Sequence, residues 1–306
     1  MSFSRGVKQE LAHIRLRSGA LKRAQLYGLT HAAGTLKLGR TLGIEYVTET
    51  HEVGRHIATL ATSLYDLDAT LSLRDTERRL TLTVVTLNGD NCEALLTDAG
   101  LFKRTDAGVE LPQKIPHASL KTDDLKKAFL RGVFMGAGSC SDPKRAYHLE
   151  IVCRSEELAQ ALCGLMGGLA LEAKTVRRKE RTVVYLKEGD RIASFLALLG
   201  ASTATLSFED TRAEKELRNY INRMSNCETA NIGKTVYAAG EQLEAIERIL
   251  RHKSHKRLTP ALRETAELRL HHPDASLQEL ADLAGIGKSG MNHRLQRLLQ
   301  IAERLS

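Results

Sequence analysis

The sequence lacks long apolar runs, and this limits the classes of protein to which the chain can belong. No apolar stretch approaches the roughly 20 residues that a membrane-spanning helix needs. The first residues, MSFSRGVKQELAHI, carry charges where a secretory signal peptide has an uninterrupted apolar segment. We therefore expect a cytoplasmic protein that has no membrane partner.

Cysteine is also scarce, and its pattern excludes two kinds of stabilisation. The five cysteines are odd in number, widely scattered and never arranged as a CxxC pair, so neither a disulfide framework nor a zinc knuckle is indicated. No cysteine or acidic ligand stands at finger-like spacing from the four histidines that flank the linker before the last helices, which are His252, His255, His271 and His272. We expect no metal and no cofactor.

The excess of basic residues is the first positive indication of function. The chain has 306 residues, of which 45 are Lys or Arg and 37 are Asp or Glu, so its formal net charge is +8. This length predicts about two domains. A basic chain favours a polyanionic partner such as nucleic acid, although charge alone does not identify that partner.

A pattern of helices and paired strands occurs twice in the first 200 residues, which indicates an internal repeat. The first unit has predicted helices and strands at 20–33, 35–47, 51–65, 69–74, 79–86 and 90–99. The second unit has them at 122–137, 147–153, 155–166, 173–178, 182–186 and 191–199. Pro112 and Pro116 mark residues 111–120 as a linker between the units.

The strand pattern stops after Gly200, and the rest of the chain is helical in pattern almost throughout. We therefore predict an α+β domain at 1–205, with halves at about 1–110 and 120–205, followed by an all-α domain at 206–306.

Two similar glycine-containing strings end the first helix of each unit. They read LYGLTHAAG from residue 26 and LRGVFMGAG from residue 130, and they lie 104 residues apart. Gly28 and Gly132, each with a small residue four positions later, give each helix a face on which another backbone can approach closely. A single copy would be adequately explained as a helix cap. Two copies, each followed by strands, predict a packed helix pair.

This doubled pattern resembles the LAGLIDADG homing endonucleases. The resemblance covers residues 20–200 and implies a duplicated saddle of two αββαββα-type halves. In that family the eighth motif position is an acidic residue that binds the catalytic metal, but here it is Ala33 and Ala137. Alanine offers no ligand, so we expect nuclease activity to be absent. Asp142 is a nearby acid, but its place after the helix is typical of a turn residue.

A saddle would present basic residues to a phosphate backbone. Candidate secondary DNA contacts lie on the last hairpin of each unit, at Arg74, Arg78, Arg79, Lys174, Arg177, Arg178, Lys179 and Arg181. Charged hairpins also occur as solvated turns that protect strand edges, and the saddle is equally suited to binding a protein.

The most specific motif in the chain is a helix-turn-helix at residues 276–305. Ser276 can cap a first helix, Gly285 supplies a left-handed corner, and a second helix turns Met291 and Leu295 inward. A preceding helix at 260–271 begins with Thr259 as its cap and proline at its first position, and it would complete a trihelical core.

The second helix of the motif carries polar side chains suited to DNA. Asn and Gln can pair with adenine, while Lys and Arg reach guanine or phosphates. The candidate DNA-binding residues are Lys288, Ser289, Asn292, His293, Arg294, Gln296 and Arg297. The alternative is a helical hairpin whose surface is basic by accident, but the corner glycine favours DNA binding.

A further string, NCETANIGKTVYAA at 226–239, begins where the helical segment takes over. Its position suggests interdomain packing, with Glu228 either pairing with Lys234 or capping the helix. The inward face of the following helix is predicted to comprise Val236, Ala239, Leu243, Ile246 and Ile249.

The same string, together with MSFSRGVKQEL and HLEIVCRS, resembles the WhiA family over essentially the whole chain. That family combines a degenerate LAGLIDADG domain with a helix-turn-helix. The resemblance implies a nucleoid-associated regulator of transcription in cell division, chromosome segregation or sporulation.

We therefore expect a sequence-specific regulator that is not an enzyme and whose partner is double-stranded DNA. One alternative is an adaptor whose N-terminal domain binds a protein, such as a sigma factor or another regulator. The other is an active site-specific endonuclease, which Ala33 and Ala137 disfavour.

Overall fold

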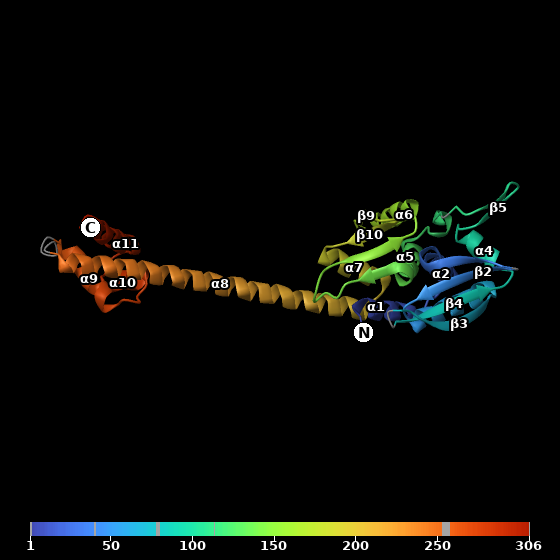
Figure 1. The fold of residues 1–306 in the computed structure, drawn as a ribbon, viewed down its shortest axis with the longest axis horizontal. Coiled ribbons are helices and arrows are strands. Elements are labelled where there is room, and N and C mark those ends of the chain that lie inside the picture. Colours follow the sequence, from blue (N-terminus) through green and yellow to red (C-terminus); the bar gives the residue numbers. More distant parts are fainter. Residues whose placement is uncertain (1, 40, 78–79, 113, 253–257, 306) are drawn as a thin grey trace. The chain divides into compact units, whose positions relative to one another are not determined.

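The computed structural model describes every residue except 1, 40, 78–79, 113, 253–257 and 306, and it also leaves the side chains of 227, 228 and 230–232 undescribed. The described chain forms two compact units, residues 1–215 and 216–306 (Figure 1). The division falls within the helix α8 (Ser202–Arg251). The sequence places the boundary near residue 205, close to the start of this helix.

Unit 1 is built from two halves with the same order of elements. The first half consists of α2 (Gly19–Ala33), β1 (Gly34–Leu38), β2 (Leu42–Thr48), α3 (His51–Tyr65), β3 (Asp68–Asp75), β4 (Thr81–Asn88) and α4 (Cys92–Asp98). The second half consists of α5 (Asp123–Ala137), β7 (Gly138–Cys140), β8 (Leu149–Cys153), α6 (Glu156–Gly167), β9 (Lys174–Arg178), β10 (Arg181–Leu186) and α7 (Gly189–Leu199). The predicted αββαββα repeat is confirmed.

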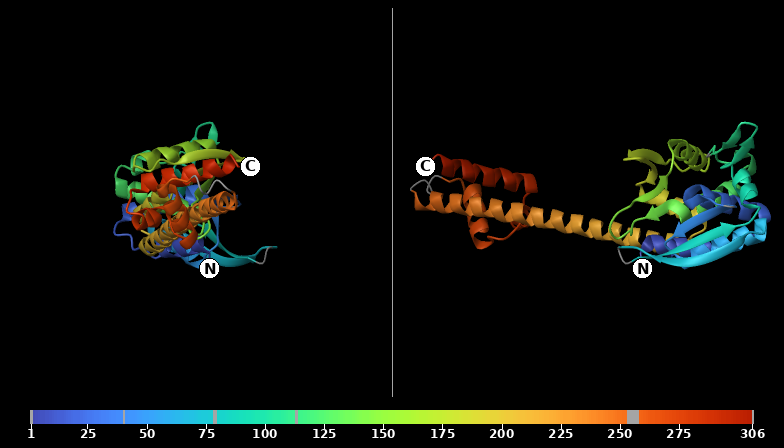
Figure 2. Two further views of the ribbon diagram at one scale, coloured as in Figure 1. Left: turned by 90° about the vertical axis from the view of Figure 1, so that its left-hand side faces the viewer. Right: turned by 45° about the vertical axis from the view of Figure 1, so that its right-hand side comes forward.

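Each half contains one four-stranded antiparallel sheet. The strand orders are β1-β2-β4-β3 and β7-β8-β10-β9, so the two sheets have equivalent topology. Gly34 pairs with Tyr46 in the first sheet, and Gly138 pairs with Ile151 in the second. These pairs set the correspondence between the halves, which lie side by side in the views of Figures 1 and 2.

Helices α2 and α5 join the two halves. Their backbones approach so closely that a side chain at the contact would overlap the other helix. A Cβ atom added at Gly28 would lie 2.1 Å from the carbonyl oxygen of Phe129. One added at Gly132 would lie 2.1 Å from the carbonyl oxygen of Gln25. Phe129 follows Gln25 by the same 104 residues that separate Gly132 from Gly28, so the contact is reciprocal. The predicted packing of the glycine helices is confirmed.

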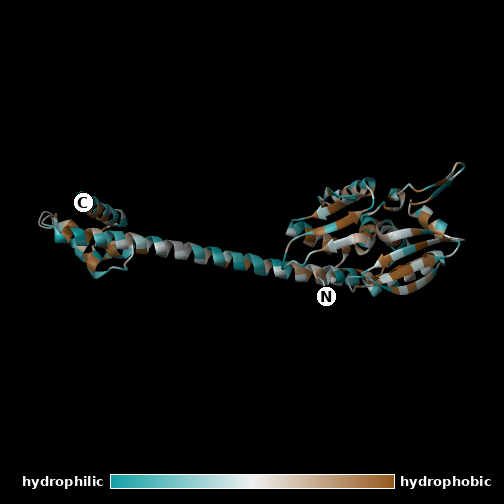
Figure 3. Ribbon diagram, viewed as in Figure 1, coloured by the Kyte–Doolittle hydropathy of each residue, from teal (hydrophilic) through white to brown (hydrophobic). Residues whose placement is uncertain are grey.

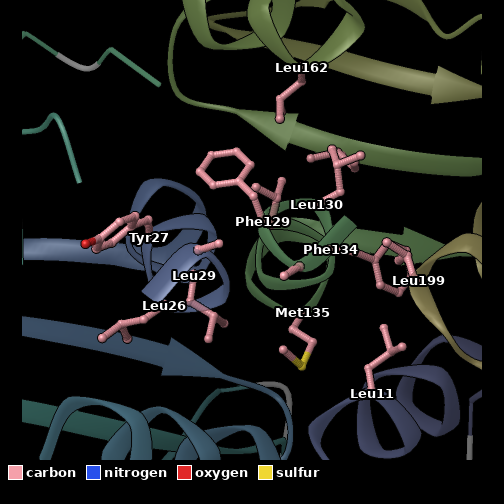
Figure 4. Close-up of a cluster of buried hydrophobic side chains, with 14 of the residues drawn as sticks. Leu11, Leu26, Tyr27, Leu29, Phe129, Leu130, Phe134, Met135, Leu162 and Leu199 are labelled. Carbon is pink, nitrogen blue, oxygen red and sulfur yellow. The ribbon is translucent and has the colours of Figure 1, made fainter. Parts of the chain in front are cut away.

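The buried side chains of both halves form one continuous core around this helix pair. Leu26 and Leu29 of α2 and Phe129 and Leu130 of α5 are completely buried, and Figure 4 shows them together. Strand β2 buries Ile44 and Tyr46 on the same side, and the Tyr46 hydroxyl lies 2.8 Å from the Thr30 hydroxyl. Alternate residues of each strand therefore face the helices, and the others form an open face on each sheet.

Five short elements of unit 1 are absent from the sequence prediction. They are α1 (Phe3–Ala12), the hairpin β5 (Lys103–Thr105) and β6 (Gly108–Glu110), the 3₁₀ turn η1 (His117–Ser119), and β7. Helix α1 buries Val7 and Leu11 in the core. The Glu10 carboxylate accepts the backbone N–H groups of Thr203 and Ala204 at 2.7 and 3.0 Å, and thereby satisfies the first turn of α8.

Unit 2 has its own core, formed by the later part of α8 with α9 (Pro260–His271), α10 (Leu277–Leu283) and α11 (Lys288–Glu303). Apolar residues alternate with polar ones along these helices in Figure 3. Thr259 caps α9 as predicted, with its hydroxyl accepting the N–H of Leu262 at 3.4 Å. Nowhere in the described chain is a helix both long and apolar enough to cross a membrane.

The predicted inward face of α8 is wrong at one position. Val236 is 62% exposed, whereas Ala239, Ile246 and Ile249 are buried. The helical period is correct, but α8 is buried only from Ala239 onward in this region, and the described core cluster of unit 2 includes it from Ala245. The predicted pair of Glu228 with Lys234 falls outside the described residues, since the Glu228 side chain is undescribed.

The close approach of α2 and α5 predicts opposite effects for two glycine-to-alanine substitutions. Gly132→Ala places a methyl group against the Gln25 carbonyl and should destabilise unit 1 by about 3 kcal/mol. Gly164→Ala, inside α6, meets nothing within 4 Å and should be neutral or stabilising by up to about 1 kcal/mol. Thermal unfolding followed by circular dichroism measures both. Equal stability of the two variants would contradict the described packing.

Candidate nucleic-acid interface

The helix-turn-helix of unit 2 begins with a capping box at α10. The Ser276 hydroxyl accepts the N–H of Glu279 at 3.3 Å, and the Glu279 carboxylate accepts the N–H of Ser276 at 2.7 Å. These hydrogen bonds with Ser276 lower the pKa of the Glu279 carboxyl. Two of the unpaired donors at the helix start are thereby satisfied, which sets where the motif begins.

The corner between α10 and α11 depends on Gly285. Its φ of +63° lies in the left-handed region that glycine adopts without a Cβ penalty. The N–H of Ile286 then donates to the carbonyl of Ala281 at 3.0 Å, closing the end of α10. Helix α11 starts two residues later at Lys288. The sequence prediction of this corner is confirmed.

Helix α11 has one buried and one exposed face. Met291, Leu295, Leu298 and Ala302 are buried in the unit 2 core at spacings of three and four residues. Six of the seven predicted DNA-binding residues are exposed, and these are Lys288, Ser289, Asn292, His293, Gln296 and Arg297. The exposed face therefore carries hydrogen-bonding groups of the length that base edges require.

The seventh predicted residue, Arg294, lies at the edge of this face. Its guanidinium forms an ion pair with Glu264 of α9 at 3.2 Å and is only partly exposed. This contact ties α11 to the helix that supports it. Arg297 instead donates to the Gln300 side chain at 3.1 Å within α11 and stays exposed.

A buried arginine that the sequence analysis missed holds the motif in place. Arg269 of α9 donates through Nε to the Gln242 side chain of α8 at 3.0 Å, and through Nη1 to the carbonyl of Ala275 at 2.6 Å. Its side chain is almost completely buried, and this burial lowers the pKa of its guanidinium. Arg269 therefore fixes the turn before α10 against α8 and α9.

The other candidate site is the C-terminal end of the α2 and α5 pair, where Ala33 and Ala137 stand. Both strands that follow begin with a glycine, Gly34 and Gly138. The guanidinium of Arg154, which follows β8, donates to the Gly34 carbonyl, and its other terminal nitrogen donates to the Thr35 hydroxyl at 3.3 Å. An arginine of the second half thus reaches the first half beside Ala33.

This end of the helix pair is poor in groups that could hold a metal. Burial lowers the pKa of His31 to about 4, so its ring is neutral, and Nε2 lies 2.7 Å from the carbonyl of Ala99. Asp142 is exposed and accepts the N–H of Lys144 at 2.8 Å, as a turn residue does. The described residues contain no group of three or more potential ligands. A metal ion at this end of the helix pair would therefore lie beside the positive charge of Arg154, with no described group of carboxylates to hold it.

The predicted histidine-rich region is only partly described. His271 lies 2.8 Å from the carbonyl of Glu267 through Nδ1, one turn earlier in α9. His272 caps the end of that helix, and His255 falls outside the described residues.

The open face of each sheet carries the same ion pair. Arg74 of β3 lies 3.6 Å from Glu45 of β2, and Arg178 of β9 lies 2.9 Å from Glu150 of β8. Glu45 precedes Tyr46 and Glu150 precedes Ile151, so the two glutamates occupy equivalent positions. The arginines of these pairs are exposed, so the pairs add little stability, but they reduce the positive charge that a phosphate would meet.

The remaining predicted saddle cations gather on the hairpin of the second half. Lys174, Arg177, Lys179 and Arg181 are all exposed. Arg181 pairs in register with Arg178, whereas Lys179 occupies the turn with a φ of +54°. Arg78 and Arg79 of the first half fall outside the described residues. Unpaired positive charge in the described saddle is therefore concentrated on one half.

Two family models match the chain. One is described as the WhiA LAGLIDADG-like domain and matches residues 126–218, and the other as the WhiA C-terminal HTH domain and matches residues 221–302. A curated relative from Alkaliphilus metalliredigens, named "Probable cell division protein WhiA", is 40% identical over 99% of this chain and 98% of its own length. One of the same name from Clostridium beijerinckii is 38% identical over 100% and 99%.

Solved structures show the same fold. Full-length WhiA from Thermotoga maritima covers 100% of this chain and 99% of its own, with a TM-score of 0.62 at 23% identity. The N-terminal LAGLIDADG domain of WhiA covers 65% of this chain and 90% of its own, with a TM-score of 0.53 at 20% identity. The predicted duplicated saddle followed by a helix-turn-helix is confirmed.

The position of Arg269 generates a prediction about the stability of unit 2. Arg269→Ala removes a buried charged donor, so the Ala275 carbonyl and the Gln242 side-chain oxygen each lose a hydrogen bond. The substitution should therefore destabilise unit 2 by about 3 kcal/mol. Arg251→Ala removes only an exposed pair with Glu247 and should cost less than about 1 kcal/mol. Hydrogen exchange of the amides of α10 and α11 measures both effects. Equal protection in the two variants would show that Arg269 does not hold the motif.

Proposed function

The chain belongs to the WhiA family, and on that premise we propose that it regulates cell division by binding specific duplex DNA through α11 without cleaving it. Its curated relatives are named probable cell division proteins. The observation that carries the proposal is the exposed polar face of α11, supported from behind by a closed core and a well-defined corner.

Helix α11 enters the major groove with its N-terminal half leading. The groove of B-DNA is about 12 Å wide and admits a helix, and the first turns of a recognition helix lie nearest the base edges. Asn292 and Gln296 can each make two hydrogen bonds to an adenine, and His293 lies beside them on the exposed face. Lys288 and Ser289, at the start of the helix, contact phosphates or the first base.

The two arginines of α11 take different tasks. Arg294 acts as a positioning residue, because its charge is engaged by Glu264 and only part of the side chain is accessible. Arg297 is exposed on the flank of the helix and reaches a phosphate. The base-contacting set is therefore Ser289, Asn292, His293 and Gln296.

The N-terminal domain is proposed to have lost nuclease chemistry. Ala33 and Ala137 supply no oxygen for a divalent ion, and Arg154 places a positive charge beside the first of them. The domain contributes affinity through the unpaired cations of its second half, Lys174 and Arg181, more than through Arg74 and Arg178, whose charges are offset by glutamates.

The equivalent Glu–Arg pairs also favour a second candidate function, that of an adaptor. Both open sheet faces place an anion among their cations, an arrangement that suits a protein surface better than a polyanion. In this alternative the N-terminal domain recruits a protein regulator and α11 alone provides attachment to DNA.

A matched pair of glutamines tests the proposed orientation of α11. Gln296 and Gln300 have the same side chain on the same exposed face, one helical turn apart. Gln296→Ala should weaken binding to a selected genomic fragment by about tenfold or more, because a bidentate base contact contributes about 1–3 kcal/mol. Gln300→Ala should leave it nearly unchanged.

Fluorescence anisotropy with a labelled duplex at fixed salt concentration measures both affinities. An arbitrary duplex of equal length serves as the reference, because loss of a base contact should affect only the selected fragment. Equal losses for Gln296→Ala and Gln300→Ala, or equal losses on both duplexes, would contradict base readout by the first half of α11.

A further inference from the structure

The segment that joins α1 to α2 has few main-chain hydrogen bonds. Residues 14–17, with the sequence Ile-Arg-Leu-Arg, belong to no helix or strand. Ile14 donates to the carbonyl of Leu11 at 3.4 Å, but among the described residues no main-chain hydrogen bond involves Arg15, Leu16 or Arg17. This short stretch therefore offers donors and acceptors in the manner of a sheet edge.

Side chains alternate along the same segment. Ile14 and Leu16 are partly buried and pack against the core of unit 1, whereas Arg15 and Arg17 are exposed. Within the described part of the chain, neither arginine forms an ion pair with a carboxylate. The alternation anchors the segment through its apolar residues and presents two unneutralised cations to solvent.

A hollow of about 210 Å³ lies beside this segment. Its walls combine the apolar side chains of Ile14, Leu16 and Leu21 with the cations of Arg15, Arg17, Lys127 and Arg131, and Asp124 is the acidic residue among them. Asp124 lies 3.6 Å from Lys127, which offsets its charge. Three arginines therefore determine the electrostatic character of the hollow.

Arg131 is the innermost of these arginines. Its Nε donates to the carbonyl of Leu199 at 2.6 Å, and its Nη1 lies 3.4 Å from the Gln25 side chain. Burial lowers the pKa of this guanidinium, and its described partners are all neutral. A partly buried guanidinium without an anion is costly, so an arriving carboxylate would gain more from Arg131 than from a solvated lysine.

We propose that residues 14–17 and this hollow form a docking site for an acidic peptide segment of a partner protein, bound in extended conformation. The main chain of the peptide pairs with the free groups of alternate residues, Arg15 and Arg17, and its carboxylates meet the side chains of Arg15, Arg17 and Arg131. Its apolar residues lie against Ile14 and Leu21. This mode combines main-chain pairing for affinity with alternate side chains for specificity.

A peptide fits these features better than a nucleic acid does. A phosphodiester backbone has neither the donors to pair with the free carbonyls of residues 15–17 nor apolar groups for the hollow. The site also lies at the N-terminal ends of α2 and α5, whereas Ala33 and Ala137 lie at their C-terminal ends. The proposed site therefore lies at the opposite end of the helix pair from Ala33 and Ala137 and shares no residue with the proposed DNA contacts, so it does not depend on DNA binding.

The test uses the full chain and a labelled peptide of alternating glutamate and valine. The charge-reversal variant is Arg15→Glu with Arg17→Glu, and the matched control is Arg55→Glu with Lys103→Glu, which changes the net charge equally at two exposed cations elsewhere. We expect the first variant to weaken peptide binding by at least about tenfold in anisotropy titrations, and the control to weaken it less than about twofold.

Two further probes distinguish strand pairing from non-specific electrostatic attraction between the acidic peptide and the basic protein. A peptide of alternating glutamate and proline has the same charge but lacks N–H groups at every second residue, so it should bind at least about tenfold more weakly. Hydrogen exchange of the amides of Arg15 and Arg17 should slow when the glutamate–valine peptide binds. Arg15→Gln with Arg17→Gln, a milder change, should give an intermediate loss and a native circular dichroism spectrum.

Several outcomes would overturn the proposal. If the charge-reversal variant and its control weakened peptide binding equally, the loss of affinity would be due to net charge alone and not to this site. Equal affinity for the two peptides, or unchanged exchange at Arg15 and Arg17, would exclude strand pairing. If the charge-reversal variant weakened binding to an arbitrary DNA duplex as much as binding to the peptide, the segment would belong to a nucleic-acid surface instead.

Discussion

The close approach of α2 and α5 at Gly28 and Gly132 is the constraint on which the N-terminal unit depends. Because each glycine lies against a backbone carbonyl of the other helix, the two halves can share one core only if both positions stay without a side chain. The reciprocity of these contacts fixes the pseudo-twofold relation between the sheets. The equivalent Glu45–Arg74 and Glu150–Arg178 pairs follow from that relation.

The same frame shows where the two halves have diverged. The helix ends carry alanines, and Arg154 of the second half bonds to the first half at Gly34, beside Ala33. Unpaired cations remain on the second sheet. Unit 2 has an independent core, in which Arg269 and the Gly285 corner position α11. We infer that the chain keeps a nuclease-like scaffold while DNA readout belongs to the helix-turn-helix.

Much of this architecture was predictable because it depends on local signals. Ser276 and proline after Thr259 each indicate a helix cap within a few residues. The contact between α2 and α5 was predictable because its glycine string occurs twice. Contacts that single charged side chains make with distant segments were not predictable. Arg154, Arg269 and the pairing of Arg294 with Glu264 resemble surface charges in the sequence, and only the tertiary fold buries or engages them. Val236 fits the apolar spacing of α8, but it is exposed, because no described residue of the core covers that part of the helix.

The central claim is that α11 selects DNA and that the N-terminal unit does not cut it. The most direct test is the selection of genomic fragments by the full chain in the presence of magnesium, repeated with an Asn292→Ala, Gln296→Ala variant. The account predicts that the natural chain enriches a defined set of fragments and returns them uncut, and that the variant loses the enrichment. Cleaved fragments, or enrichment that survives in the variant, would contradict it and assign recognition to the saddle.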